Sequence, residues 1–179
     1  MFIVKGARGF SLLEVLVSLL LVSIGALGMA ALQGNSVRYT QDALQRNEAM
    51  LLAQQLLEQM RSNPKGALSN NKFSSSSAYY KAPGDAFETA THSDCATRDR
   101  GAGGDDVAKA DLACWLQSVQ ASLPVTSAIL SANYSICPSQ SDGSCSADAS
   151  SAVMIQIAWK DPTGQCDDNL CIYRLRGEL

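Results

Sequence analysis

An apolar run close to the N-terminus constrains the fold of this chain more than any other feature. Residues 12–32 contain a single charged side chain, that of Glu14. As a helix the run is about 32 Å long at about 1.5 Å per residue, which is enough to cross the hydrocarbon core of a bilayer. A carboxylate at the centre of a bilayer costs about 2.5–3.5 kcal/mol. The position of Glu14 therefore needs an explanation of its own.

Two general interpretations account for the apolar run but not for its carboxylate. A secretory signal peptide would use Lys5 and Arg8 as its basic region and the small residues at 26–28 as its cleavage site. A plain signal anchor would use the same basic residues to keep the N-terminus in the cytoplasm and the rest of the chain outside. Neither interpretation gives Glu14 a partner.

The third interpretation starts from residues 9–14, Gly-Phe-Ser-Leu-Leu-Glu, which follow a short basic leader. This sequence resembles the processing site of the type IV prepilins. The resemblance implies that a prepilin peptidase cleaves after Gly9 and N-methylates Phe10, and that Glu14 serves assembly. In a helix, the new amine of Phe10 and the carboxylate of Glu14 lie about one turn apart. Opposite charges at that separation offset each other's loss of hydration.

The same resemblance implies a division of the chain. Residues 1–9 would be the cleaved leader, 10–32 the transmembrane and assembly half of a long helix, 33–62 its amphipathic half, and 63–179 a periplasmic globular domain. The helix is expected to end before Pro64. We interpret the apolar residues of its second half as one stripe facing a core: Val37, Leu44, Leu51, Leu52, Leu56 and Met60.

The remainder of the chain predicts one helix and a small sheet. Residues 64–104 are polar and loop-like, and Asp105 and Asp106 are predicted to cap a helix over 107–123 with Trp115 in the core. Strands are expected over 133–137, 153–160 and 171–176, the last two forming an antiparallel hairpin. In the longer of these two strands, alternation predicts one buried face. The fold class is therefore α+β: the type IV pilin fold, with a long N-terminal α-helix packed on a C-terminal antiparallel β-sheet in a disulfide-bonded, loop-rich globular domain.

All cysteines lie in the C-terminal half of the chain. The six are Cys95, Cys114, Cys137, Cys145, Cys166 and Cys171. An even number after an export-type segment indicates disulfides formed in an oxidising compartment. Sequence alone does not choose the pairing, and nearest-neighbour pairing is our hypothesis. A zinc site is disfavoured because there is no Cys-x2-Cys pair and only one histidine, His92.

No catalytic or cofactor-binding pattern stands out. A Ser-x-x-Lys match at residues 69–72 lies in a serine-rich tract, and His92 lies in a polar loop. The carboxylates of Asp161, Asp167 and Asp168 have irregular spacing for a calcium loop. The net charge of −3, without a basic stripe, disfavours nucleic acid as a partner. We predict a protein that is not an enzyme and that has no cofactor and no metal.

Within this family, the sequence most resembles the minor pilins of the PilV type. The resemblance extends through Gly-Ala-Leu-Gly at residues 25–28 and Gln-Gln-Leu-Leu-Glu-Gln-Met-Arg-Ser-Asn-Pro at 54–64. It implies a low-copy subunit of the bacterial inner membrane, with a periplasmic domain, that primes pilus assembly with other minor pilins and the major pilin. The pilus tip, with an adhesin, would be its final location. Two alternatives stay open: a minor pseudopilin of a type II secretion system, and a DNA- or surface-binding pilin.

Overall fold

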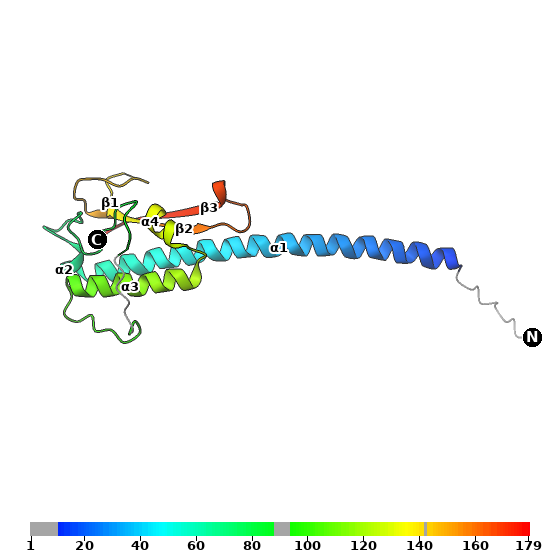
Figure 1. The fold of residues 1–179 in the computed structure, drawn as a ribbon, viewed down its shortest axis with the longest axis horizontal. Coiled ribbons are helices and arrows are strands. Elements are labelled where there is room, and N and C mark those ends of the chain that lie inside the picture. The colour runs from blue at the N-terminus through cyan, green and yellow to red at the C-terminus, as the bar shows by residue number, and fades with distance from the viewer. Residues whose placement is uncertain (1–10, 88–93, 142) are drawn as a thin grey trace, which may run out of the picture. The chain divides into compact units, whose positions relative to one another are not determined.

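The computed structural model describes residues 11–87, 94–141 and 143–179 (Figure 1). Its elements in chain order are α1 (Leu12–Arg61), α2 (Pro64–Ala67), α3 (Asp105–Ser122), α4 (Ser127–Asn133), β1 (Ser135–Pro138), β2 (Ala152–Lys160), the 3-10 helix η1 (Asp167–Asn169) and β3 (Leu170–Glu178). The chain divides into two compact units, Met1–Thr40 and Gln41–Leu179.

The expected long helix is present as α1, which contributes residues to both units. It begins after Ser11, whose carbonyl oxygen accepts hydrogen bonds from the backbone N–H groups of Glu14 at 3.0 Å and Val15 at 3.2 Å. It ends at Arg61 because Pro64 cannot continue the backbone hydrogen-bond pattern. Pro64 instead opens the four-residue helix α2, which lies in a segment that the sequence predicted as loop.

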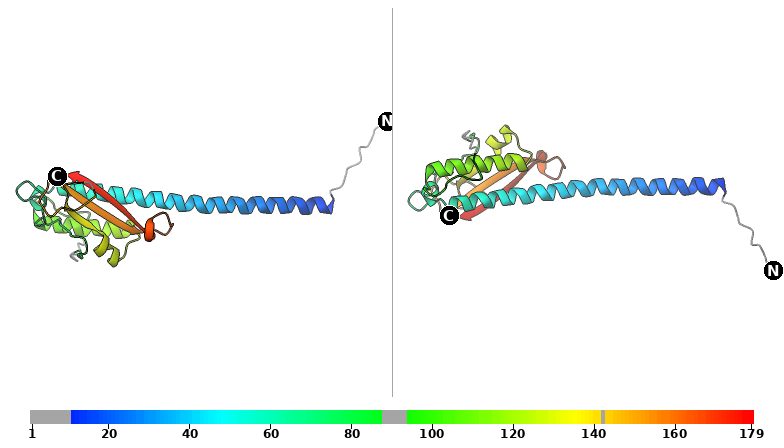
Figure 2. Two further views of the ribbon diagram at one scale, coloured as in Figure 1. Left: turned by 90° about the horizontal axis from the view of Figure 1, so that it is seen from above. Right: turned by 90° about the horizontal axis from the view of Figure 1, so that it is seen from below.

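The core of the second unit is a sheet covered by helices. The three strands are antiparallel in the order β1-β2-β3, which confirms the predicted hairpin of β2 and β3 (Figure 2). On one face of this hairpin Ile155 lies opposite Leu175, and Ile157 lies opposite Tyr173. These side chains join one hydrophobic cluster with Leu56 and other residues of α1.

The prediction that β2 buries only one face is wrong. Met154 and Ala158 lie on the opposite face from Ile155, yet their exposed fractions are 3% and 0%. The reason is α4, a helix that the sequence did not suggest, which contacts β2. The side-chain amide of Gln156 donates to the carbonyl of Asn133, the last residue of α4, at 2.8 Å and fixes the end of that helix to the strand.

The predicted single apolar stripe on α1 separates into two. One set faces the core: Ala49, Leu52, Ala53, Leu56, Leu57 and Met60. By contrast Leu44 and Leu51 are 58% and 55% exposed, and Val37 is 56% exposed. Leu51 is two residues from Ala49 and from Ala53, and about 100° per residue places it on the far side of the helix. The seven-residue spacing therefore marks an exposed face rather than the core.

The helix predicted over 107–123 is α3, with two differences at its start. Its N-cap is Gly104, with a φ of 89°, and it has no side-chain cap. Asp105 and Asp106 occupy the first turn instead, where their charges favour the helix dipole without capping it. Trp115 is fully buried, as predicted, and its indole N–H donates to the carbonyl of Leu52 on α1 at 2.8 Å.

Three disulfides close the second unit. They join Cys95 to Cys114, Cys137 to Cys145 and Cys166 to Cys171, which is nearest-neighbour pairing. The first ties the segment before α3 to that helix. The third closes the turn through which the chain enters β3.

Candidate assembly site

The apolar run of the first unit, residues 12–32, is exposed in the described structure. Its large side chains are exposed on every side of the helix, for example Leu12 at 79% and Leu32 at 72%. The others are Leu13, Val15, Leu16, Val17, Leu19, Leu20, Leu21, Val22, Ile24, Leu27 and Met29. Covering one such side chain is worth about 1.5–3 kcal/mol, so covering them all is worth on the order of 20–40 kcal/mol. A segment that is apolar all round is buried by lipid or by other helices.

Among the described residues, α1 is the one helix that is long and apolar enough to cross a membrane, and its most apolar window has a mean hydropathy of 2.5. The hydroxyl groups within the apolar run satisfy themselves. Ser18 donates to the carbonyl of Glu14 and Ser23 to the carbonyl of Leu19, both at 2.7 Å. Such hydrogen bonds to the preceding turn reduce the cost of a hydroxyl in lipid. The carboxylate of Glu14 is the one side chain of the run that still needs a partner.

Glu14 lies in the first turn of α1, where the N-terminal end of the helix dipole favours a negative charge. This contribution is about 0.3–1 kcal/mol at an exposed position, which is less than the roughly 2.5 kcal/mol or more that a carboxylate costs in a membrane. The helix alone therefore does not compensate Glu14. Gly9, Phe10 and the basic leader lie outside the described residues, so cleavage after Gly9, N-methylation of Phe10 and the Phe10–Glu14 pair stay predictions.

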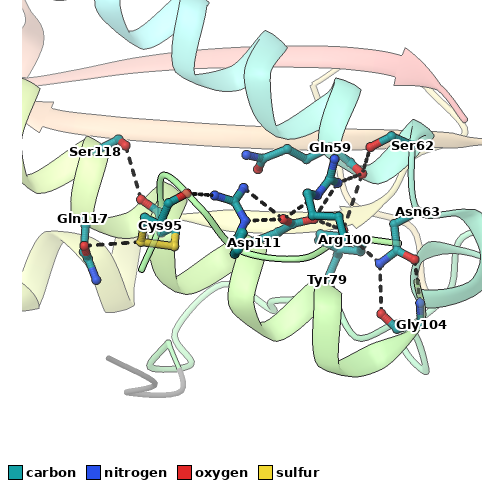
Figure 3. A network of polar contacts seen from close by, with 12 residues as sticks. Gln59, Ser62, Asn63, Tyr79, Cys95, Arg100, Gly104, Asp111, Gln117 and Ser118 are labelled. Carbon is teal, nitrogen blue, oxygen red and sulfur yellow. Dashed lines mark hydrogen bonds and ion pairs between the residues drawn. A yellow bond between two sulfur atoms is a disulfide. The ribbon is translucent and has the colours of Figure 1, made fainter. Parts of the chain in front are cut away.

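The second unit contains a polar network that holds the loop before α3 in place (Figure 3). The buried carboxylate of Asp111 accepts from Arg98, from Arg100 and from the hydroxyl of Tyr79, at distances of 2.6–3.0 Å. Arg100 also donates to the carbonyl of Gln59 on α1 at 3.0 Å. Burial, followed by the hydrogen bond to Asp111, raises the pKa of Tyr79. The network joins α1, α3, the segment that contains Tyr79 and the loop that contains Arg98 and Arg100, and it was not predicted from the sequence.

A signal for this network was available in the sequence. Ala108, Asp111, Trp115 and Val119 recur at helical spacing, so Asp111 lies on the apolar face of α3. A carboxylate on such a face must be paired, because an unpaired buried charge is too costly. Lys109 is nearer along the chain but is exposed on another side of the helix, so Arg98 and Arg100 in the loop just before α3 were the candidate partners.

Asn63 adds a second link between α1 and α3. Its side chain donates to the carbonyl of Gly104 at 2.9 Å and accepts from the Gly104 N–H at 2.7 Å. Lys81 is similarly buried, and its ammonium group donates to the carbonyls of Ala82, Ser131 and Tyr134. Burial lowers the pKa of Lys81. The side chains of Asn63 and Lys81 therefore make internal hydrogen bonds that stabilise the fold.

The other candidates from the sequence take structural roles or lie outside the described part. Ser69 and Lys72 close a tight turn through paired backbone hydrogen bonds, with Asn70 and Asn71 at φ values of 52° and 59°. This left-handed pair is typical of a hairpin turn and explains the Ser-x-x-Lys match without chemistry. His92 lies outside the described residues.

Asp161 serves its own turn rather than a calcium site. Its carboxylate accepts hydrogen bonds from Thr163, Gln165 and Cys166. Burial opposes ionisation, but the hydrogen bonds from Thr163, Cys166 and Gln165 outweigh it and hold the pKa of Asp161 at about 2. Within the described ranges, the metal-ligating side chains that converge are those of Asp42, Cys166 and Cys171. Both sulfurs are in a disulfide and so are not thiolate ligands.

Comparison with known families decides between the interpretations of the N-terminus. The prokaryotic N-terminal methylation motif matches residues 4–30, and the family of type IV pilin Tt1218 matches residues 31–102. The chain is a type IV pilin. No curated protein and no solved structure matches it. The long helix, the antiparallel sheet and the disulfides agree with the pilin fold, and the family is structural rather than enzymatic.

Membership in the family identifies what covers the apolar helix. Before assembly the pilin is anchored in a membrane through α1. A prepilin peptidase processes the pilin, and the pilin later assembles with other pilins. The secretory signal peptide and the plain anchor are thereby set aside. The match to residues 4–30 includes Gly9, Phe10 and Glu14, the residues on which the resemblance was first based.

Proposed function

We propose that this pilin is a minor pilin of a type IV pilus. It is incorporated at low copy and primes assembly, in a tip complex with other minor pilins and an adhesin. The observation that supports an assembly role most strongly is the uncompensated Glu14 at the start of an exposed apolar helix. Lipid covers the helix before assembly and neighbouring helices cover it afterwards, and both leave Glu14 in need of a cation.

Processing supplies that cation. Cleavage after Gly9 creates a charged amine at Phe10, four residues before Glu14 in the sequence. In the membrane this carboxylate pairs with its own amine, and during assembly it pairs with the amine of a neighbouring subunit. Within an apolar environment such a pair is directional, so Glu14 sets the axial position at which the pilin docks.

The minor role and the PilV type rest on the similarity of residues 25–28 and 54–64 to that group. The three disulfides and the polar segment before α3 favour a pilus subunit over a minor pseudopilin of a type II secretion system. The globular unit is periplasmic before assembly in this proposal, because Lys5 and Arg8 would hold the N-terminus in the cytoplasm. The inner membrane and then the pilus tip are its two locations.

The first test is mass spectrometry of the N-terminal peptide, on pilin taken from cell envelopes and from sheared filaments. We expect a peptide that begins at N-methylated Phe10 in both samples, with the pilin a small minority of the filament subunits. A chain that begins at Met1 would refute the proposal, and absence from filaments would favour the secretion system. Loss of the gene should then abolish surface pili and twitching, not exoprotein release.

The second test uses the Glu14→Ala variant, which removes the carboxylate. Removing one partner of a buried ion pair costs about 3–5 kcal/mol, so incorporation into filaments should fall by roughly a hundredfold while cleavage continues. Ser18→Ala is the matched control, because that hydroxyl is satisfied within the helix and its loss should leave incorporation unchanged. Normal incorporation of the Glu14→Ala variant would contradict an assembly role for this carboxylate.

A further inference from the structure

The sheet of the second unit has one long edge, along β3. The strand order β1-β2-β3 places β3 at the edge, and the strand runs for nine residues without a proline. At the opposite edge, the backbone of Ile136 in β1 is already paired with Lys81. The edge strands of natural proteins are usually short, bulged, proline-containing or covered, because an open edge is a template for another strand.

The hydrogen-bond pattern shows which residues of β3 face outward. Lys160 of β2 lies opposite Leu170, but its N–H donates to the carbonyl of Pro124, on the other side of the strand. Lys160 and Leu170 are therefore a pair without mutual hydrogen bonds. Because the two kinds of pair alternate in an antiparallel ladder, every second residue of β3 from Leu170 directs its N–H and C=O groups to the open edge. After Leu170, the residues with outward backbone groups are therefore Ile172, Arg174, Arg176 and Glu178.

Two further contacts agree with this assignment. The N–H of Leu179, one residue out of phase with that series, donates inward to the carbonyl of Ser151 at 3.1 Å. The carbonyl of Glu178, which is in phase, points outward and accepts from the guanidinium of Arg61 at 2.9 and 3.0 Å. Arg61 thus covers one end of the edge. Within the part of the chain that the structure describes, the outward backbone groups of Ile172 and Arg174 have no partner.

The side chains beside this edge determine what can pair with it. Ile172 is 41% exposed, and Arg174 is exposed on the same face, where its guanidinium donates one hydrogen bond to the side-chain oxygen of Gln156 in β2 at 2.6 Å and keeps its charge unpaired by any carboxylate among the described contacts. A second copy of β3 paired antiparallel around Arg174 would bring guanidinium groups opposite one another, which disfavours self-pairing. A strand with carboxylates at alternate positions would instead place one of them against the guanidinium of Arg174, with its other side chains on the opposite face.

We propose that the open edge of β3 binds an extended acidic segment of a different subunit as a fourth strand. The backbone groups of Ile172 and Arg174 provide affinity through main-chain hydrogen bonds, and the charge of Arg174 favours an acidic sequence. The charge of Arg174 thus disfavours self-pairing and favours an acidic partner at once. This surface is separate from the apolar helix and Glu14, so it does not depend on whether the assembly is a pilus or a secretion pseudopilus.

The test uses full-length pilin in detergent micelles and two nine-residue peptide probes that alternate valine with glutamate or with lysine. We expect the acidic probe to bind about tenfold more tightly than the basic one at low salt, and the difference to shrink as salt is added. Residue-resolved hydrogen exchange should slow at Ile172 and Arg174 on binding. Exchange at Tyr173 and Leu175, already bonded within the sheet, should not change.

Two variants separate the backbone and charge contributions. Ile172→Pro removes an outward N–H without removing a ladder hydrogen bond, so binding of the acidic probe should fall about tenfold. Arg174→Glu should reverse the preference between the probes, whereas Lys72→Glu, a charge change on a distant turn, should not. The proposal is overturned by equal affinity for both probes, by no binding, or by binding that survives Ile172→Pro. Concentration-dependent protection of Ile172 and Arg174 without a probe would also overturn it, because the partner would then be a second copy.

Discussion

The Asp111 network makes the strongest quantitative prediction for the globular unit. Asp111→Asn keeps the size of the side chain but removes its charge and replaces one acceptor oxygen with a donor nitrogen. The arginine side chains are only 14% exposed for Arg98 and 31% for Arg100, so water replaces the lost acceptor incompletely. Breaking a buried pair costs about 3–5 kcal/mol, and the partial exposure of Arg100 favours the lower value.

A loss of about 3 kcal/mol is a large part of the 5–15 kcal/mol that stabilises an ordinary domain. With a urea slope of about 1–3 kcal/mol per molar, the unfolding midpoint should fall by about 1 M or more. Both tryptophans of the chain, Trp115 and Trp159, are buried in this unit, so their fluorescence reports its unfolding in the full chain with disulfides intact.

The control is Glu58→Gln, which removes an ion pair with Arg61 whose side chains are 67% and 43% exposed. Exposed pairs contribute about 0.2–1 kcal/mol, so this variant should shift the midpoint far less. A double-mutant cycle with Arg100→Met should show that the arginine contributes less once Asp111 is neutral. Equal midpoints for Asp111→Asn and Glu58→Gln would refute the assignment of the network as a structural link.

Two further predictions concern the sheet and the turn before it. Gly177→Ala would place a Cβ atom 2.5 Å from a methyl group of Leu57, so urea unfolding should show a loss of about 1–3 kcal/mol, and the double variant with Leu57→Ala should lose less than the sum of the single changes. For Asp161, a folded pKa of about 2, below the unfolded value of about 3.9, means that its contribution is complete above pH 4 and is lost as the pH falls toward 2. Asp161→Asn should flatten this part of the acid-unfolding curve measured by fluorescence, and an unchanged curve would show that other carboxylates dominate.

The sequence was sufficient where a single periodicity or a single residue decides the outcome. Local rules predicted the long helix from the apolar run, its end from Pro64, and the hairpin of β2 and β3 from alternation around a turn. Nearest-neighbour pairing of the cysteines was also correct, because cysteines close along the chain need only a short loop to meet. It was insufficient where two elements compete for one surface. The spacing of Leu44 and Leu51 looks like a core stripe, but the core is built around Ala49 and Ala53. Only the packing of α3 against α1 shows which side of α1 faces the core.

The candidate site was predictable only in part. Glu14 could be selected as a candidate because one carboxylate in an apolar helix is anomalous on physical grounds alone, and its role in assembly stays a prediction. The open edge of β3 could not, because an unpaired backbone group has no signature in the amino-acid sequence. It requires the strand order and the register, which are long-range properties.

The apolar helix with Glu14 and the open edge of β3 also differ in the kind of partner that each would bind. An apolar helix with one carboxylate near its start accepts any helix of the same kind and thus supports repetitive assembly. An edge strand with Arg174 beside its open backbone groups would instead favour an acidic sequence. A subunit that begins a filament must do both, because it has to join the common helical core and also hold a partner that the other subunits do not. Because Glu14 belongs to the first unit and β3 to the second, the two proposed surfaces share no residue.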